Sequence, residues 1–179
     1  VNNQNRPFRN EEDRLVFRPS GHGALLPNLN EVDADVVFIK NIDNVAAEEY
    51  VEEIAFYKKV LAGKLLWLQG KIFGYLNDLQ EEVTIEQMKE MHSFVWNELN
   101  IKDIPSGRAD LIEVLHRPIR VCGVVKNTGA PGGGPFWVKD GDGATSLQIV
   151  EASQIDVTDT HQKSILKEAT HFNPVDLVC

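Results

Sequence analysis

An unbroken apolar run that closes on amides and a carboxylate constrains the fold of this chain more than any other stretch. Residues 36–39 are Val-Val-Phe-Ile, and this short β-branched run favours a strand covered on both faces, as in a parallel α/β sheet, over a short buried helix. Because side chains alternate along a strand, Asn41 and Asp43 would point to one face. Loops converge on a crevice at the carboxyl edge of such a sheet, so we expect a ligand site there.

The acidic residue at this edge has two interpretations. The carboxylate of Asp43 suits Mg²⁺, a hard cation that takes one or two carboxylates together with phosphate oxygens. Asp43 equally suits the N-cap of a helix that the sequence predicts from near Val45. Capping and metal binding are compatible, so both interpretations stay open.

A histidine between two glycines precedes the predicted strand. Gly21 and Gly23 permit backbone conformations closed to other residues and let a ligand approach the main chain. His22 would then donate to a phosphate or ribose oxygen, although a histidine in such a turn needs no chemical role. The leucines within 25–29 predict a short helix that packs on the sheet.

Charge and cysteine content exclude several classes of protein. With 18 Lys and Arg against 27 Asp and Glu, the formal charge of -9 argues against a nucleic-acid partner and against an anionic membrane surface. No signal sequence is visible, and no apolar run approaches the roughly 20 residues that span a bilayer. We interpret Cys122 and Cys179 as buried thiols rather than a disulfide, which predicts a cytoplasmic protein.

The middle of the chain, about 45–117, predicts helices rather than catalytic groups. Apolar residues recur there at helical spacing. The run from Leu65 to Leu79 is apolar nearly all round and should be buried. Glycines lower helix stability, so Gly63, Gly70 and Gly74 predict close helix packing or a break. We assign this part to a helical insertion that supports the site, binds a partner or forms a lid.

Strands return in the last third of the chain. A predicted strand over 119–126 carries Gly123 in its interior, where a glycine often marks a bulge or the close approach of a ligand. The glycines at 132–134 form either a nest of backbone N–H groups for an anion or a flexible hairpin loop. Residues 140–143, Asp-Gly-Asp-Gly, are a turn signal, so the strand-like runs on either side should form a hairpin.

These motifs resemble those of a known group of enzymes. Pro-x-Gly-His-Gly, a short helical gap and a strand closing on Asn-Ile-Asp-Asn resemble the UDP-sugar pyrophosphorylases, the sugar-phosphate uridylyltransferases of the GT-A-like nucleotidyltransferase superfamily. Still more closely, the chain resembles an uncharacterised, mainly Bacteroidetes family whose members are longer. The resemblance implies an α/β fold, a partial GT-A/Rossmann-like mixed sheet formed by 1–44 and 118–179 around the helical insertion. We expect one domain overall, truncated at both ends.

The resemblance also implies a reaction, the attack of a sugar 1-phosphate on the α-phosphate of UTP with release of pyrophosphate. Asp43 would hold Mg²⁺ and act with His22 as the catalytic pair. Asn41 and His22 would orient nucleotide or phosphate groups, and Gly21 and Gly23 would line the nucleotide. The implied partners are UTP or a UDP-sugar and a sugar 1-phosphate, while the oligomeric state stays open.

The sugar side of the site follows from later segments. Residues 147–154 and Phe172-Asn173 are similar to the segments that build the sugar side in the pyrophosphorylases. By that match Glu151 would accept from sugar hydroxyls, Asn173 would contact the sugar, and Gly123 would let the sugar approach the main chain. Residues 174–176, Pro-Val-Asp, depart from the pattern, because the pyrophosphorylases carry further asparagines there.

Two elements of the superfamily are missing from the sequence. No glycine-rich loop ending in Arg or Lys precedes Val1, and no later strand supplies the usual basic residue. We therefore expect this stretch alone to be inactive and the full-length protein to carry the triphosphate clamps. A non-catalytic nucleotide-sugar-binding or regulatory protein, a GT-A-type glycosyltransferase and a structural interaction module remain alternatives.

Overall fold

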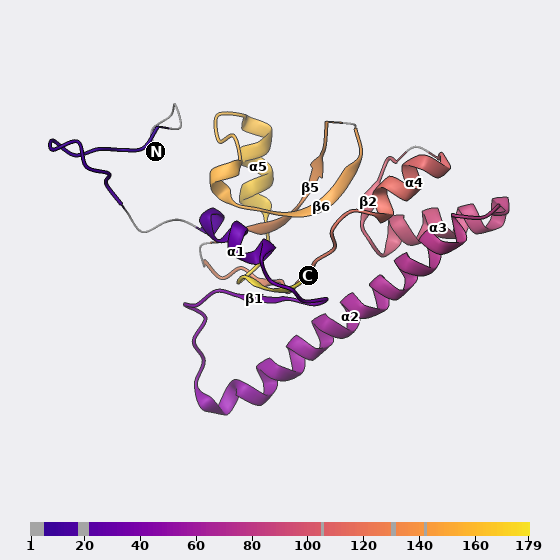
Figure 1. Ribbon diagram of the computed structural model, residues 1–179, viewed down its shortest axis with the longest axis horizontal. Coiled ribbons are helices and arrows are strands. Elements are labelled where there is room, and N and C mark those ends of the chain that lie inside the picture. The colour runs from indigo at the N-terminus through magenta and orange to yellow at the C-terminus, as the bar shows by residue number, and fades with distance from the viewer. Residues whose placement is uncertain (1–5, 18–21, 105, 130–131, 142) are drawn as a thin grey trace. The chain divides into compact units, whose positions relative to one another are not determined.

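The computed structural model of the chain forms two compact units, Val1–Asp35 and Val36–Cys179, which are described separately. In the first unit an isolated antiparallel bridge joins Arg9 to Leu15. A 3₁₀ helix, His22–Leu25, leads into α1, Leu26–Asn30. The predicted short helix is therefore present, and its leucines at 25 and 26 are largely exposed. The structure describes residues 6–17, 22–104, 106–129, 132–141 and 143–179 (Figure 1).

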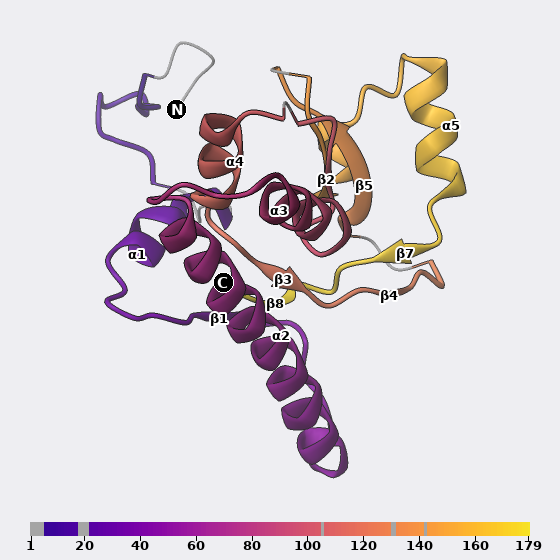
Figure 2. The same cartoon turned by 90° about the vertical axis from the view of Figure 1, so that its right-hand side faces the viewer.

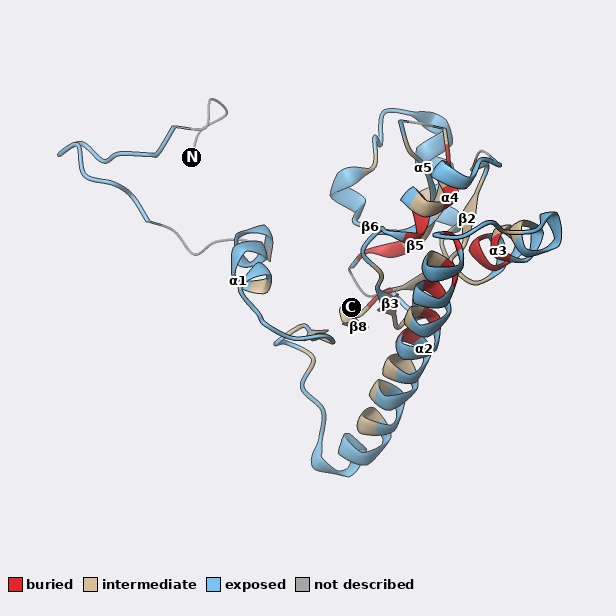
Figure 3. Ribbon diagram, turned by 45° about the vertical axis from the view of Figure 1, so that its right-hand side comes forward, coloured by how far each residue is buried: buried red, intermediate tan, exposed pale blue. Residues whose placement is uncertain are grey.

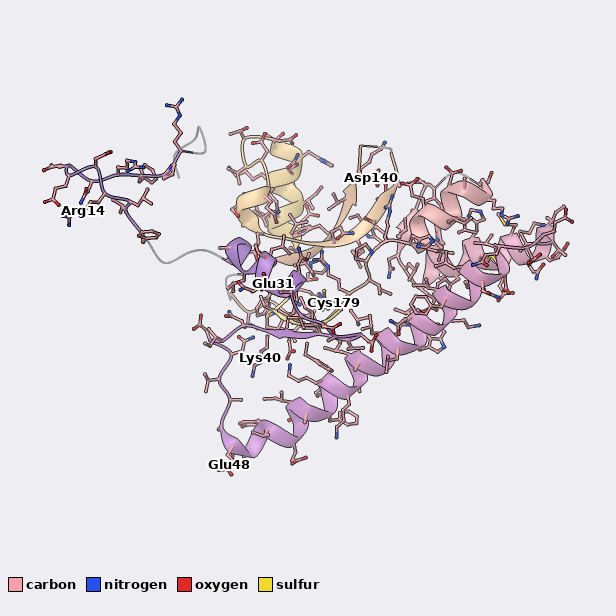
Figure 4. All side chains as sticks on the ribbon, in the orientation of Figure 1. Arg14, Glu31, Lys40, Glu48, Asp140 and Cys179 are labelled. Carbon is pink, nitrogen blue, oxygen red and sulfur yellow. The ribbon has the colours of Figure 1, made fainter. Side chains whose placement is uncertain are left out.

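The second unit is built along one long helix. A 3₁₀ turn, Glu48–Tyr50, leads into α2, Val51–Asp78, which runs unbroken for 28 residues; Figure 4 labels Glu48 at its beginning. Glutamates in the first turn suit the positive end of the helix dipole. Within the described residues no helix, α2 included, has an apolar stretch able to cross a bilayer.

Two predictions about this helix were wrong. The helix does not begin near Val45, because the chain is still extended at Ala47, and Asp43 therefore lies in an earlier turn rather than at the N-cap. The glycines at 63, 70 and 74 neither break α2 nor pack closely. A Cβ built at each of them meets no heavy atom within 4 Å in the described part of the chain.

The core lies where α2 meets two shorter helices, α3 (Ile85–Asn97) and α4 (Arg108–Leu115). The predicted start of α3 is confirmed, since Thr84 and Gln87 form a capping box. One face of α2 is buried and the other is exposed, so the 65–79 run is only half covered (Figure 3). The buried side chains of this core are Leu68, Ile72, Tyr75, Leu79, Met91, Phe94, Val95, Leu111, Val114 and Leu115.

Three small antiparallel sheets complete the unit (Figure 2). The first has the order β1-β8-β3, formed by Phe38–Lys40, Asp176–Val178 and Val121–Cys122. The second has the order β2-β6-β5, formed by Ile101–Lys102, Thr145–Val150 and Gly134–Lys139. The third pairs β4, Val125–Lys126, with β7, His171–Phe172, and α5, Thr160–Glu168, precedes β7.

The expectation of a parallel strand buried on both faces was wrong. β1 is an edge strand that pairs antiparallel with β8, with Phe38 opposite Val178. Side chains point to the faces of a sheet, and the face of β1 that carries Phe38 is left 49% exposed, while Ile39 on the opposite face is half-buried. The mixed α/β class and the β5–β6 hairpin are confirmed.

The two cysteines are free thiols, as predicted, although each is half-buried rather than fully buried. Burial raises the pKa of the Cys122 thiol in β3, and the positive charge of Arg120 opposes that shift only in part. A raised pKa keeps this thiol protonated and weakly nucleophilic at neutral pH.

Tyr75 gives the core an alkaline pH dependence. Its hydroxyl donates to Glu90 Oε1 at 2.9 Å, and burial together with this carboxylate raises the pKa of Tyr75 to about 12. An unfolded chain releases the same proton near pH 10. The resulting stabilisation is therefore complete below about pH 10 and is lost as the pH rises towards 12.

We expect Tyr75→Phe to flatten this loss of stability. The measurement is urea unfolding of wild type and variant between about pH 9 and 11.5, where the difference between the two proteins isolates Tyr75. Tyr50→Phe is the matched control, because Tyr50 is exposed. An identical alkaline slope in wild type and Tyr75→Phe would contradict the expectation.

Candidate functional site

The segment that joins β7 to β8, residues 173–176, is the centre of the candidate site. Asn173 is only 4% exposed. Its Nδ2 donates to the carbonyl of Gly123 at 2.5 Å, and its Oδ1 accepts from the N–H of Val175 at 3.0 Å. Its own N–H donates to the carbonyl of Gly133 at 2.7 Å. The Asn173 side chain thus ties the end of β3 to the segment, and its backbone N–H ties the glycine run to it.

The polar turn after β1 is attached to the same segment. Asn41 N–H donates to the carbonyl of Val175 at 2.9 Å, and the Asn44 side chain donates to the carbonyl of Pro174. Within the turn, Asp43 N–H lies 3.4 Å from Asn41 Oδ1. The Asp43 carboxylate is exposed. Asn41 and Asn44 anchor the turn to the segment. Asp43, which lies between them in sequence, is therefore held beside the segment.

Val175 holds a strained backbone at the centre of this arrangement. Its φ is 56°, a left-handed conformation that a β-branched residue rarely adopts. Its N–H is held by Asn173 and its carbonyl by Asn41, so hydrogen bonds on both sides of the residue fix the conformation. Backbone strain of this kind persists where the surroundings impose it, and it concentrates at functional sites.

The glycine run packs against other segments of the same chain rather than forming an open loop. A Cβ on Gly133 would lie 3.1 Å from Glu151 Oε1, and a Cβ on Gly134 would lie 3.0 Å from the carbonyl of His171. Gly133 and Gly134 are both buried, and Gly134 begins β5. These glycines are therefore needed for close approach, which places the exposed Glu151 side chain directly against Gly133.

The predicted residues thus fall into two groups. Asn41, Gly123 and Asn173 meet around residues 173–176, and Glu151 joins them through Gly133. Gly23 lies in the first unit, directly after His22, the first residue of the 3₁₀ helix. Gly23 is exposed. Gly21 lies outside the described residues.

Sequence reasoning missed an ion pair beside this segment. The ammonium of Lys58 in α2 pairs with the carboxylate of Asp176, and the two side chains are 24% and 25% exposed. The Lys58 ammonium also lies 6.0 Å from the ring centroid of Phe38. The departure from the pyrophosphorylase pattern at 174–176 pointed to Asp176, but nothing in the helical pattern singled out Lys58.

A cavity of about 370 Å³ reaches the chain on either side of Gly123, and sequence reasoning did not predict it. Its lining includes Cys122 and Val124, which flank Gly123 in sequence, but none of the residues predicted for the site. Two cations on its wall already have acceptors. Lys64 Nζ lies 2.6 Å from Glu98 Oε2, and Arg120 donates to Gln148 Oε1 at 3.0 Å. The cavity is therefore mixed in character, with an apolar floor and paired charges.

The donors near Asp43 fit a cation that a substrate shares. In the described ranges no group of three or more His, Cys, Asp or Glu side chains could hold a metal ion by itself. Mg²⁺ keeps several waters and is commonly bound by one or two carboxylates plus substrate phosphates. One exposed carboxylate in a turn that also carries the Asn41 amide is compatible with that kind of shared site.

Comparison with known proteins gives a family and no function. The chain matches no curated protein and no solved structure. The family model described as "Domain of unknown function (DUF4301)" matches residues 1–179, the whole chain. The chain therefore belongs to the DUF4301 family.

Proposed function

We propose that the full-length protein is nucleotidyltransferase-like and transfers a uridylyl group from UTP to a sugar 1-phosphate. One structural observation carries the proposal. Asn41, Gly123 and Asn173, which the resemblance to UDP-sugar pyrophosphorylases assigns to one site, are joined by hydrogen bonds around residues 173–176 although they are far apart in sequence. Within the proposal, the small sheets belong to a GT-A/Rossmann-like domain.

The chain's own residues would position charge rather than form covalent bonds. Phosphoryl-type transfer depends mainly on alignment and charge neutralisation. Asp43 would hold a Mg²⁺ ion that neutralises the phosphates of the substrate. Asn41 would orient the nucleotide. Glu151 would accept hydrogen bonds from sugar hydroxyls, which its exposed side chain leaves free to approach.

The structure refines the role assigned to Asn173. Both functional atoms of its amide are already bonded to the main chain, and the side chain is buried. Asn173 is therefore a positioning residue, which holds Gly123 and Val175 where a sugar would meet the backbone. One N–H of Nδ2 and one lone pair of Oδ1 are not used by these two bonds, so burial of the side chain is what limits a direct contact to the sugar.

A second candidate is a protein that binds a nucleotide sugar without turnover. The residues joined around 173–176 and the exposed Glu151 would serve such a protein equally, because binding alone needs no clamp on a triphosphate. A GT-A-type glycosyltransferase is the other alternative, and it would need an acceptor cleft as well as a nucleotide-sugar site.

Thermal unfolding of the full-length protein with UTP, UDP-sugars and Mg²⁺, paired with an assay for pyrophosphate, tests these candidates. Uridylyl transfer predicts a raised unfolding midpoint and pyrophosphate release that needs a sugar 1-phosphate. Ligand at about 100 times its Kd stabilises a protein by about 2.7 kcal/mol, which is several degrees. Stabilisation without pyrophosphate would favour the non-catalytic binder. No stabilisation by any ligand would refute both.

A further inference from the structure

The exposed side of α2 carries a heptad pattern that the core does not use. Six residues follow one another at alternating intervals of four and three, the spacing of a and d positions in a coiled coil. All six are exposed, whereas the other side of the helix is buried from Leu65 onward and half-buried before it (Figure 3). We call them the heptad seam: Phe56, Val60, Gly63, Trp67, Gly70 and Gly74.

Large residues and glycines are arranged along this seam so that each large side chain can face a glycine of an antiparallel second copy. If a second copy of α2 lies antiparallel across an axis near Leu65, every layer combines one large side chain with one glycine. Every layer also pairs an a position with a d position, as antiparallel coiled-coil packing requires. The six layers are of three kinds, each occurring twice by symmetry: Phe56 with Gly74, Val60 with Gly70, and Trp67 with Gly63. In a parallel pair Trp67 would meet Trp67 and glycine would meet glycine, which overpacks one layer and leaves others empty.

The surface beside the glycines is hollowed to match. A cavity of about 300 Å³ has Gly70, Lys71, Gly74, Tyr75 and Met91 in its lining. No described atom lies within 4 Å of a Cβ built on Gly70 or Gly74. In the antiparallel arrangement Phe56 and Val60 of the second copy reach these two glycines. The hollow thus lies where the incoming side chains need room.

The exposed apolar area is large enough for a specific interface. Phe56 and Phe73 are each 61% exposed and Trp67 is 45% exposed. An aromatic side chain buries about 150–250 Å², so with Val60 and Leu66 each copy offers on the order of 500 Å². Two copies would bury about 1,000 Å², which reaches the lower bound for a biological interface.

The flanking positions are compatible with the same arrangement. Leu66, which precedes Trp67, would lie beside Leu66 of the second copy, and Lys59 would lie beside Phe73, where an ammonium can approach the ring. Lys64 already has Glu98 as its partner, at 2.6 Å. The antiparallel pair therefore brings no unpaired lysine from this position against the seam.

We propose that the heptad seam binds a second copy of this chain, forming an antiparallel helix pair with two-fold symmetry. The interface is isologous, because each copy supplies both the large side chains and the glycines that receive them. It lies on the face of α2 turned away from the core.

Sedimentation equilibrium of the full-length protein tests the proposal. We expect a wild-type dimer, and Val60→Glu should raise its dissociation constant at least about tenfold, because the interface would bury two carboxylates, one in each of the two layers that combine residue 60 with Gly70. Val51→Glu is the matched control, since Val51 and Val60 are 52% and 51% exposed on the same helix and only Val60 belongs to the seam. A monomeric wild type at about 100 µM, or an equal loss in both variants, would overturn the proposal.

Cysteine cross-linking tests the orientation of the helices. Positions 60 and 70 share a layer only in the antiparallel pair, so a mixture of Val60→Cys and Gly70→Cys proteins should form a disulfide-linked dimer. Val60→Cys alone should not, because its two copies would be about 15 Å apart along the axis. Wild type, with Cys122 and Cys179, sets the background. Efficient cross-linking of Val60→Cys alone would indicate a parallel pair and refute the arrangement.

Discussion

Asp43→Asn is expected to lower uridylyl transfer by the full-length protein at least about 100-fold. A metal ion contributes several kcal/mol by neutralising developing charge on a transferring phosphoryl group, and each 1.36 kcal/mol is about tenfold in rate. Asparagine keeps the shape of the side chain and removes the charge that holds Mg²⁺. The measurement is pyrophosphate release at saturating UTP and sugar 1-phosphate over a series of Mg²⁺ concentrations.

The fold should not change in this variant, because the Asp43 side chain is exposed and the turn is held by its neighbours Asn41 and Asn44. Asp103→Asn is the control. Asp103 is exposed and has a φ of 60°, a conformation that asparagine also tolerates. Its activity should match wild type. Wild-type turnover by Asp43→Asn would remove the metal role from that residue.

Asn173→Ala is expected to lower the free energy of unfolding by about 2–4 kcal/mol. The substitution leaves the Gly123 carbonyl and the Val175 N–H without their partner, and each unsatisfied group costs about 1–3 kcal/mol. The substitution also allows Val175 to leave its left-handed conformation. The release of this backbone strain offsets part of the lost free energy of unfolding. Urea denaturation followed by circular dichroism measures the change.

A local readout separates this role from a general loss of packing. In Asn173→Ala the Val175 amide should exchange hydrogen much faster than amides of α3, because its acceptor is gone. Asn97→Ala is the control, since Asn97 is exposed on α3 and bonds only within its own helix, to Ser93. A loss below about 0.5 kcal/mol for Asn173→Ala would show that the buried amide does not hold the segment.

Local sequence patterns predicted the elements whose determinants are local. The capping box at Thr84 and the helical spacing after it predicted α3, and both signals act within a few residues. The turn at 140–143 predicted the β5–β6 hairpin for the same reason. In each case neighbours in sequence are also neighbours in space.

The errors concern partners that are distant in sequence. The run at 36–39 gives no information on its neighbour, and that neighbour is β8, with Phe38 paired to Val178. The prediction of burial on both faces failed because the run does not show which elements pack on those faces, and Phe38 is 49% exposed. The 65–79 run was expected to be wholly buried, yet its unused face has the spacing of the heptad seam.

The candidate site shows the same difference between what sequence patterns predict and what depends on partners that are distant in sequence. Resemblance of motifs pointed to Gly123 and Asn173, and the structure joins them by a hydrogen bond. Lys58 was not predicted, because its partner Asp176 is distant in sequence. Helical periodicity does not identify such a pair. The resemblance assigns Asn173 to the sugar, and the structure adds two bonds from its amide to the backbone that motifs alone do not reveal.

The position of β8 between β1 and β3 has a consequence for the order of folding. β8 is drawn from residues 176–178, so the β1-β8-β3 sheet cannot form during synthesis until the ribosome has released them. The helices need only contacts within about 51–115 and can assemble earlier. A nascent chain lacking this strand would already have its helical core, but β1 would be unpaired. An unpaired β1 could pair with the strand edges of other chains.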